Sequence, residues 1–88
     1  MNAERRKKIS ELIDIANDLQ SKTEELKSEI ETLRDEEQEY YDNIPESLQG
    51  GEKGDKAQEA VSSLETAISE LENFDFSSIA DSLESAKE

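Results

Sequence analysis

Residues 9–44 read ISELIDIANDLQSKTEELKSEIETLRDEEQEYYDNI, and a stripe of mostly apolar residues recurs in them at alternating steps of three and four. This spacing places the stripe along one side of an α-helix, in the pattern of a coiled coil. Neither Gly nor Pro occurs before Pro45. The stretch therefore predicts one long helix over about residues 2–42, with the whole stripe as its packing face. The stripe positions are Ile9, Leu12, Ala16, Leu19, Thr23, Leu26, Ile30, Leu33, Glu37, Tyr40 and Ile44.

A turn follows this helix. Pro45 removes a backbone donor and clashes with the preceding helical turn, so the helix should end near Asp42. We expect a turn over residues 43–55, in which residues 46–49 form one helical turn that Gly50 ends by taking a positive φ.

A second helix is expected beyond the glycines. Asp55 and Gln58 have the spacing of a capping box, so this helix should run over about residues 56–73. The segment Phe74–Ser78 then breaks the register, and Asp75 or Ser77 can cap a short third helix over about residues 77–86. The apolar stripe of the second helix is Ala57, Val61, Leu64, Ile68 and Leu71.

The expected fold class is all-α, a long antiparallel helical hairpin with a short third helix at the C-terminus. Folding the chain at the glycines pairs apolar positions throughout, for example Ile30 with Ile68 and Leu26 with Leu71. The chain has 88 residues, 32% of them hydrophobic, and a mean hydropathy of −0.94, which predicts a single domain that is too polar to bury a thick core alone. We therefore expect hairpins to assemble into a helical bundle, as a homodimer or a homotetramer.

Composition argues against several function classes. The chain has a net charge of −14, which disfavours direct binding to nucleic acid. It contains no His and no Cys, so zinc sites, disulfides and the usual nucleophilic catalysis are not expected, and we predict neither an enzyme nor a cofactor site. No apolar run exceeds two residues, so neither a membrane span nor a signal peptide is expected.

Charged residues gather in two places. A candidate acidic face at the end of the first helix holds Asp35, Glu36, Glu37, Glu39 and Asp42, and it is interpreted as a solvated surface and not as a metal site. Tyr40 should face the seam, so Tyr41 is the better candidate for a partner contact, although it can also simply cover the end of the hairpin.

The opposite end of the first helix is basic. Since Arg5, Arg6, Lys7 and Lys8 give the first eight residues a net charge of +3, residues 9–88 carry −17. Cations are unfavourable in the first turns of a helix, so this basic cluster should have another role. It can pair with the acidic C-terminal end or with a neighbouring subunit, and binding of an anionic ligand is the alternative.

A family resemblance lies in the middle of the chain. Residues 34–49, RDEEQEYYDNIPESLQ, the turn GGEKG at residues 50–54 and AVSSLETAI at residues 60–68 resemble small acidic helical proteins encoded by bacteriophages and prophages. That group has no assigned activity, so no functional residue is transferred. The resemblance implies a small accessory phage protein made in the cytoplasm of a bacterial host.

Three functions agree with these observations. The first is an inhibitor or modulator whose acidic surface mimics DNA and occupies the basic groove of a host or defence protein. The second, close behind it, is a structural or assembly module with no inhibitory role. The third is an oligomeric sponge for a small nucleotide signal, which would need the basic cluster to line its site.

Overall fold

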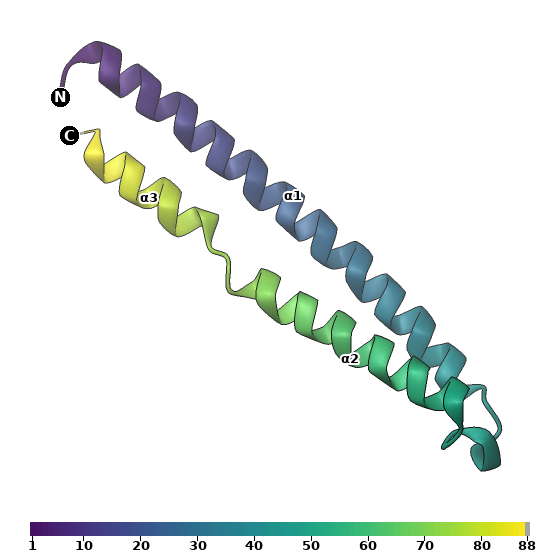
Figure 1. Cartoon of the computed structure of the whole chain (residues 1–88). Helices are drawn as coiled ribbons and strands as arrows, with labels where there is room; N and C mark the ends of the chain where they lie inside the picture. Colours follow the sequence, from purple (N-terminus) through teal and green to yellow (C-terminus); the bar gives the residue numbers. More distant parts are fainter. Residues whose placement is uncertain (88) are drawn as a thin grey trace. The chain divides into compact units, whose positions relative to one another are not determined.

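The computed structural model describes residues 1–87, and every regular element in this range is a helix (Figure 1). Helix α1 spans Ala3–Asp42, the short 3-10 helix η1 spans Glu46–Leu48, α2 spans Glu52–Glu72 and α3 spans Phe76–Ala86. The all-α class is thus confirmed. The chain divides into two compact units: unit 1 comprises Met1–Glu25 and the described residues from Phe74 onward, and unit 2 comprises Leu26–Asn73.

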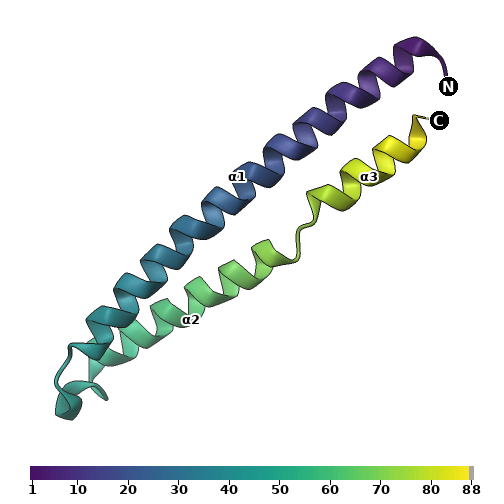
Figure 2. The same ribbon diagram turned by 180° about the vertical axis from the view of Figure 1, so that it is seen from behind.

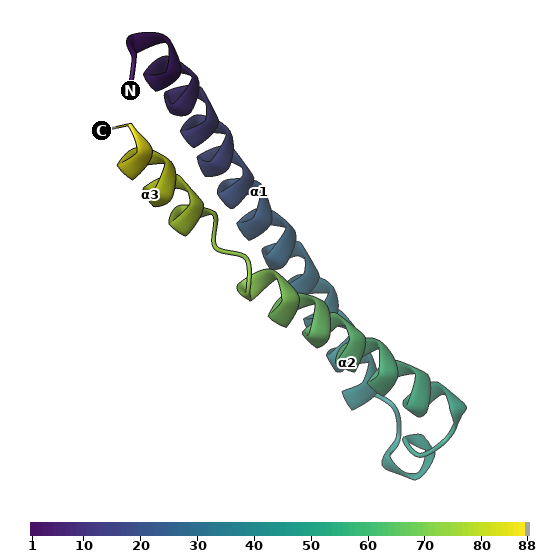
Figure 3. The ribbon, with the colours of Figure 1, turned by 60° about the vertical axis from the view of Figure 1, so that its left-hand side comes forward.

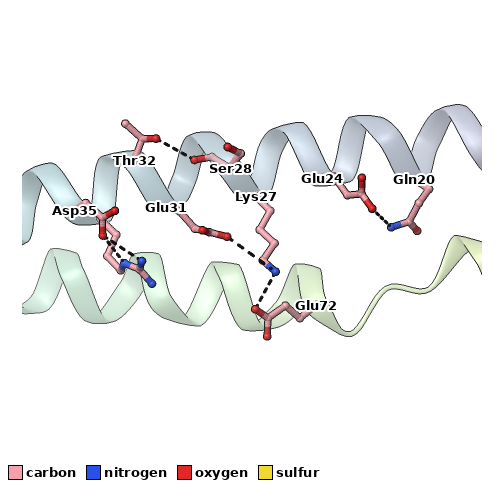
Figure 4. A network of polar contacts seen from close by, with 9 residues as sticks. Gln20, Glu24, Lys27, Ser28, Glu31, Thr32, Asp35 and Glu72 are labelled. Carbon is pink, nitrogen blue, oxygen red and sulfur yellow. Dashed lines mark hydrogen bonds and ion pairs between the residues drawn. The ribbon is translucent and has the colours of Figure 1, made fainter.

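Unit 2 is an antiparallel hairpin, in which α2 runs beside the second half of α1 (Figures 1 and 2). Its buried apolar side chains are Ala57 and Ile68, both on α2. The Lys27 ammonium lies 3.1 Å from the Glu72 carboxylate of α2 and 4.0 Å from Glu31 on its own helix (Figure 4). A thin apolar seam with charged pairs at its edge therefore joins these two helices.

Unit 1 pairs the first half of α1 with α3 (Figure 3). Ala16 is its one buried apolar residue among those described. The backbone N–H of Phe76 donates to the side-chain oxygen of Gln20 at 3.2 Å, which attaches the start of α3 to α1. Asp75 caps α3 by accepting from the Ser78 N–H at 3.1 Å, so the predicted third helix and one of its two candidate caps are confirmed.

Helix α2 begins at Glu52, four residues before the predicted start at Lys56. Asp55 lies inside the helix and donates its backbone N–H to Gly51 at 2.9 Å, so the prediction that Asp55 caps α2 is wrong. Gly54 permits this earlier start, because it is buried and its missing side chain lets the first turn of α2 lie against the backbone of Gln49. No glycine among the described residues has a positive φ, so the conformation predicted for Gly50 is also wrong.

The predicted stripe of α1 separates into two sets of positions. The set that starts at Ile9 and recurs every seven residues is buried or half-buried, whereas the set that starts at Leu12 is exposed. Ile13 and the residues every seven positions after it are half-buried instead. Successive helical residues are rotated by about 100°, so Ile13 points about 40° from the Ile9 direction while Leu12 points about 60° to its other side. The exposed set is Leu12, Leu19, Leu26, Leu33 and Tyr40, with exposed fractions of 42–54%.

This rotation corrects two predictions. Leu26 does not lie in a closed seam, because 48% of it is exposed. Tyr40 does not face the seam as predicted, because it is 47% exposed, whereas the neighbouring Tyr41 is half-buried.

Candidate functional site

The acidic end of α1 presents four exposed carboxylates. Asp35, Glu36, Glu39 and Asp42 are exposed, and their spacing of three or four residues places neighbours on one side of the helix. We call these four residues the acidic ridge. Glu37, the fifth predicted member, is half-buried and belongs to the same set of seam positions as Ile30. Glu37 is also a member of the predicted stripe, and its half-buried position agrees with that placement.

The charge of the acidic ridge is little compensated. Within residues 1–87 its one ion pair joins Asp35 to Arg34, at 3.1 Å, and the Arg34 Nε also donates to Asp35. Asp42 accepts a hydrogen bond of 3.0 Å from the neutral amide of Gln38. Since a cluster of uncompensated like charges extends a potential into solvent, the ridge can attract a basic surface from a distance.

Tyr41 connects the ridge to the turn and to α2. Its hydroxyl accepts a hydrogen bond of 2.9 Å from the side-chain amide of Gln58, and its carbonyl accepts one of 3.3 Å from Gln49. The same Gln49 amide donates to the carbonyl of Ile44 at 3.2 Å. These bonds agree with the role of covering the hairpin end, one of the two roles predicted for Tyr41, and they hold the end of α1 in place.

An apolar hollow of about 550 Å³ lies beside the ridge, at the turn of unit 2. Tyr40 and Leu48, which are 47% and 61% exposed, both contribute to its wall. Its lining residues are Tyr40, Asn43, Ile44, Pro45, Leu48, Gly51, Glu52 and Lys53. Sequence reasoning missed this hollow. The signal was three apolar residues, Ile44, Pro45 and Leu48, within a turn that is otherwise polar.

A smaller hollow of about 310 Å³ lies between α1 and α2 in the same unit. Its wall mixes polar and apolar surface, and it includes both partners of the Tyr41–Gln58 hydrogen bond; the lining residues are Gln38, Tyr41, Gln58, Val61, Ser62 and Glu65. Glu65 adds a carboxylate to it. The amides, hydroxyls and carboxylate of these residues supply several hydrogen-bonding groups, and Val61 adds an apolar side chain.

The basic cluster lies in unit 1. The Arg6 Nε donates to the carbonyl of Lys87 at 3.0 Å, and this carbonyl is one of those left without a helical partner at the end of α3. Arg5, Lys7 and Lys8 are exposed, and within residues 1–87 they form no ion pair. Arg6 therefore has a structural role at the C-terminal end, while the other three cations face solvent.

Two further properties bear on the chemistry of the described range. Over residues 1–87, no group of acidic side chains is arranged to hold a metal ion. In the same range no helix combines the length and the apolar character needed to cross a membrane.

Comparison of the chain with protein-family models, curated proteins and solved structures found no match.

Proposed function

We propose that this protein is a non-catalytic interaction module whose acidic ridge binds a basic, nucleic-acid-binding surface of another protein. The observation that carries the proposal is the exposure of four neighbouring carboxylates with one compensating ion pair among the described residues. Nucleic acid presents closely spaced negative charges to the same kind of surface. The module would therefore compete with nucleic acid for its partner.

The apolar hollow gives such an interface a second component. Charge alone accelerates encounter but contributes less to the lifetime of a complex. An apolar side chain of the partner, placed in the hollow beside Tyr40 and Leu48, would supply the desolvated contact that long-lived complexes usually contain. The resemblance to phage proteins suggests a partner in the cytoplasm of the bacterial host, such as a nucleic-acid enzyme or a defence protein.

Capture from a bacterial lysate tests this proposal. The protein is immobilised, and captured proteins are identified by mass spectrometry. We expect to capture a protein that has a basic nucleic-acid groove. Excess duplex DNA should release this protein from the immobilised module. Its affinity for the module should fall steeply with salt, because the screening length shortens from about 10 Å at 0.1 M to about 3 Å at 1 M.

A pair of charge-matched variants assigns the binding to the ridge. Changing Glu36 and Glu39 to Gln should slow association several-fold while the helix content stays constant, since Glu and Gln have similar helix propensity. The control changes Glu11 and Glu25 to Gln, which are exposed residues of α1 outside the ridge. Equal association by the two variants, or binding that does not respond to salt, would reject the ridge as the binding surface.

A second candidate function is a structural or assembly module. The exposed apolar positions of α1 favour it, because five large side chains at seven-residue intervals are typical of a helix that packs against another helix. The third hypothesis, a nucleotide sponge, has weaker support, since Arg6 already binds the end of α3.

A further inference from the structure

The exposed set of α1 positions is accompanied by a second line of exposed residues. Residues three positions after each exposed leucine lie about 60° around the helix from it, on the side away from the buried set. They are Ile15, Lys22, Glu29 and Glu36, and all four are exposed. Ile15 is 55% exposed and widens the apolar surface near the start of the helix.

The exposed set leaves large apolar side chains uncovered along α1. Its five members are 42–54% exposed, and Ile15 beside them is 55% exposed. Large apolar residues repeated every seven positions on an exposed helix face are the pattern by which two helices pack in a coiled coil. A second copy of the chain presents the same set, so α1 of one copy can cover α1 of the other.

Charge along α1 selects the direction of that second copy. The line beside the exposed leucines is basic at Lys22 and acidic at Glu29 and Glu36. Lys22 lies 3.5 Å from Asp18 on its own helix, but its side chain is 70% exposed and so remains open to a second carboxylate. Parallel copies would place each of these charges beside its own equivalent, and they would also bring the two basic clusters together. Antiparallel copies would place Lys22 of one chain near Glu29 of the other, twice by symmetry, and each basic cluster near the acidic end of the other α1.

We propose that the exposed set Leu12, Leu19, Leu26, Leu33 and Tyr40 is the contact surface for α1 of a second copy, which lies antiparallel with Leu26 near the two-fold axis. In this register Leu19 of one copy lies near Leu33 of the other, and Leu12 near Tyr40. This inference deepens the second candidate function and does not depend on the acidic ridge having a partner.

Cysteine crosslinking tests both association and direction, because the chain has no native cysteine. Three single variants, Leu19→Cys, Leu26→Cys and Leu33→Cys, are treated with a short bismaleimide. We expect Leu26→Cys to crosslink to its own copy, and a mixture of the other two to give a product of one chain of each. Neither Leu19→Cys nor Leu33→Cys should crosslink alone. The control, Ser28→Cys, is exposed on the opposite side of α1 and should give no product.

Sedimentation at micromolar protein concentration tests self-association independently of the direction of the two copies. Leu26→Glu should give half the mass of the unmodified protein, whereas Ser28→Glu should leave the mass unchanged, with helix content checked by circular dichroism for both. A monomeric mass for the unmodified protein would overturn the inference entirely. Efficient crosslinking of Leu33→Cys to itself would overturn the antiparallel direction. Neither result depends on the ridge variants, which are measured by association with a captured partner.

Discussion

Replacing Gly54 by Ala is the substitution for which the structure supports the most specific expectation about stability. It lies in the first turn of α2, where replacing Gly by Ala ordinarily stabilises a helix by about 0.5 to 1 kcal/mol. Here a methyl group would lie 2.6 Å from the carbonyl carbon of Gln49, and closer still to its oxygen. The obstacle is backbone, which cannot move aside as the end of a side chain can. We therefore expect Gly54→Ala to destabilise the protein.

The size of this effect follows from the overlap. Ordinary contact between carbon atoms begins at about 3.5 Å, so the two backbone segments would have to separate by about 1 Å. Such overpacking typically costs about 1 to 3 kcal/mol, which exceeds the gain in helix propensity. A net loss of about 1 kcal/mol would lower the melting temperature by about 4 to 8 °C in a domain of this size.

Circular dichroism at about 222 nm, recorded during heating, measures the melting temperature of each variant. All variants are compared at one protein concentration, because self-association would make the melting temperature depend on concentration. Gly50→Ala is the matched control: nothing lies within 4 Å of its added methyl group, and its φ is not positive. That variant should be stabilised by about 0.4 to 1 kcal/mol. If Gly54→Ala melts at or above the unmodified protein, the close approach of α2 to Gln49 is refuted.

Two further predictions concern the seam and the cap of α3. Ile68→Ala should lower the free energy of unfolding in urea by about 2 to 5 kcal/mol, because Ile68 is only 6% exposed. Under conditions where the protein is monomeric, Leu26→Ala should lower it by less than half as much. Equal losses would contradict the rotation of α1. Asp75→Ala should lower the free energy of unfolding by about 1 kcal/mol, because it removes the hydrogen bond from the Ser78 N–H, whereas Asp75→Asn should retain most of the stability. An unchanged melting temperature for the alanine variant would show that the cap contributes nothing.

The acidic ridge shows how far sequence reasoning reaches for the candidate site. The run of carboxylates near the end of α1 is visible in the sequence, and helical spacing already places most of them on one side. The hollow beside it depends on how η1 and the start of α2 fold back, which in turn depends on the close approach at Gly54. No periodic pattern describes such a turn, so the sequence predicted helices on either side of it but not the cavity or the early start of α2.

Local information in the sequence determined the elements of this protein. The three-and-four spacing, the absence of Gly and Pro before Pro45, and the capping residue Asp75 each act through neighbouring residues, so they predicted α1, the turn and α3 without reference to the rest of the chain. The tertiary structure decided which of the two sets on α1 is covered, and it covers the less apolar one, which includes Thr23 and Glu37. Rotation of a helix about its axis changes no local interaction; it depends on the neighbouring helix, which reaches the Ile9 set and leaves the Leu12 set exposed.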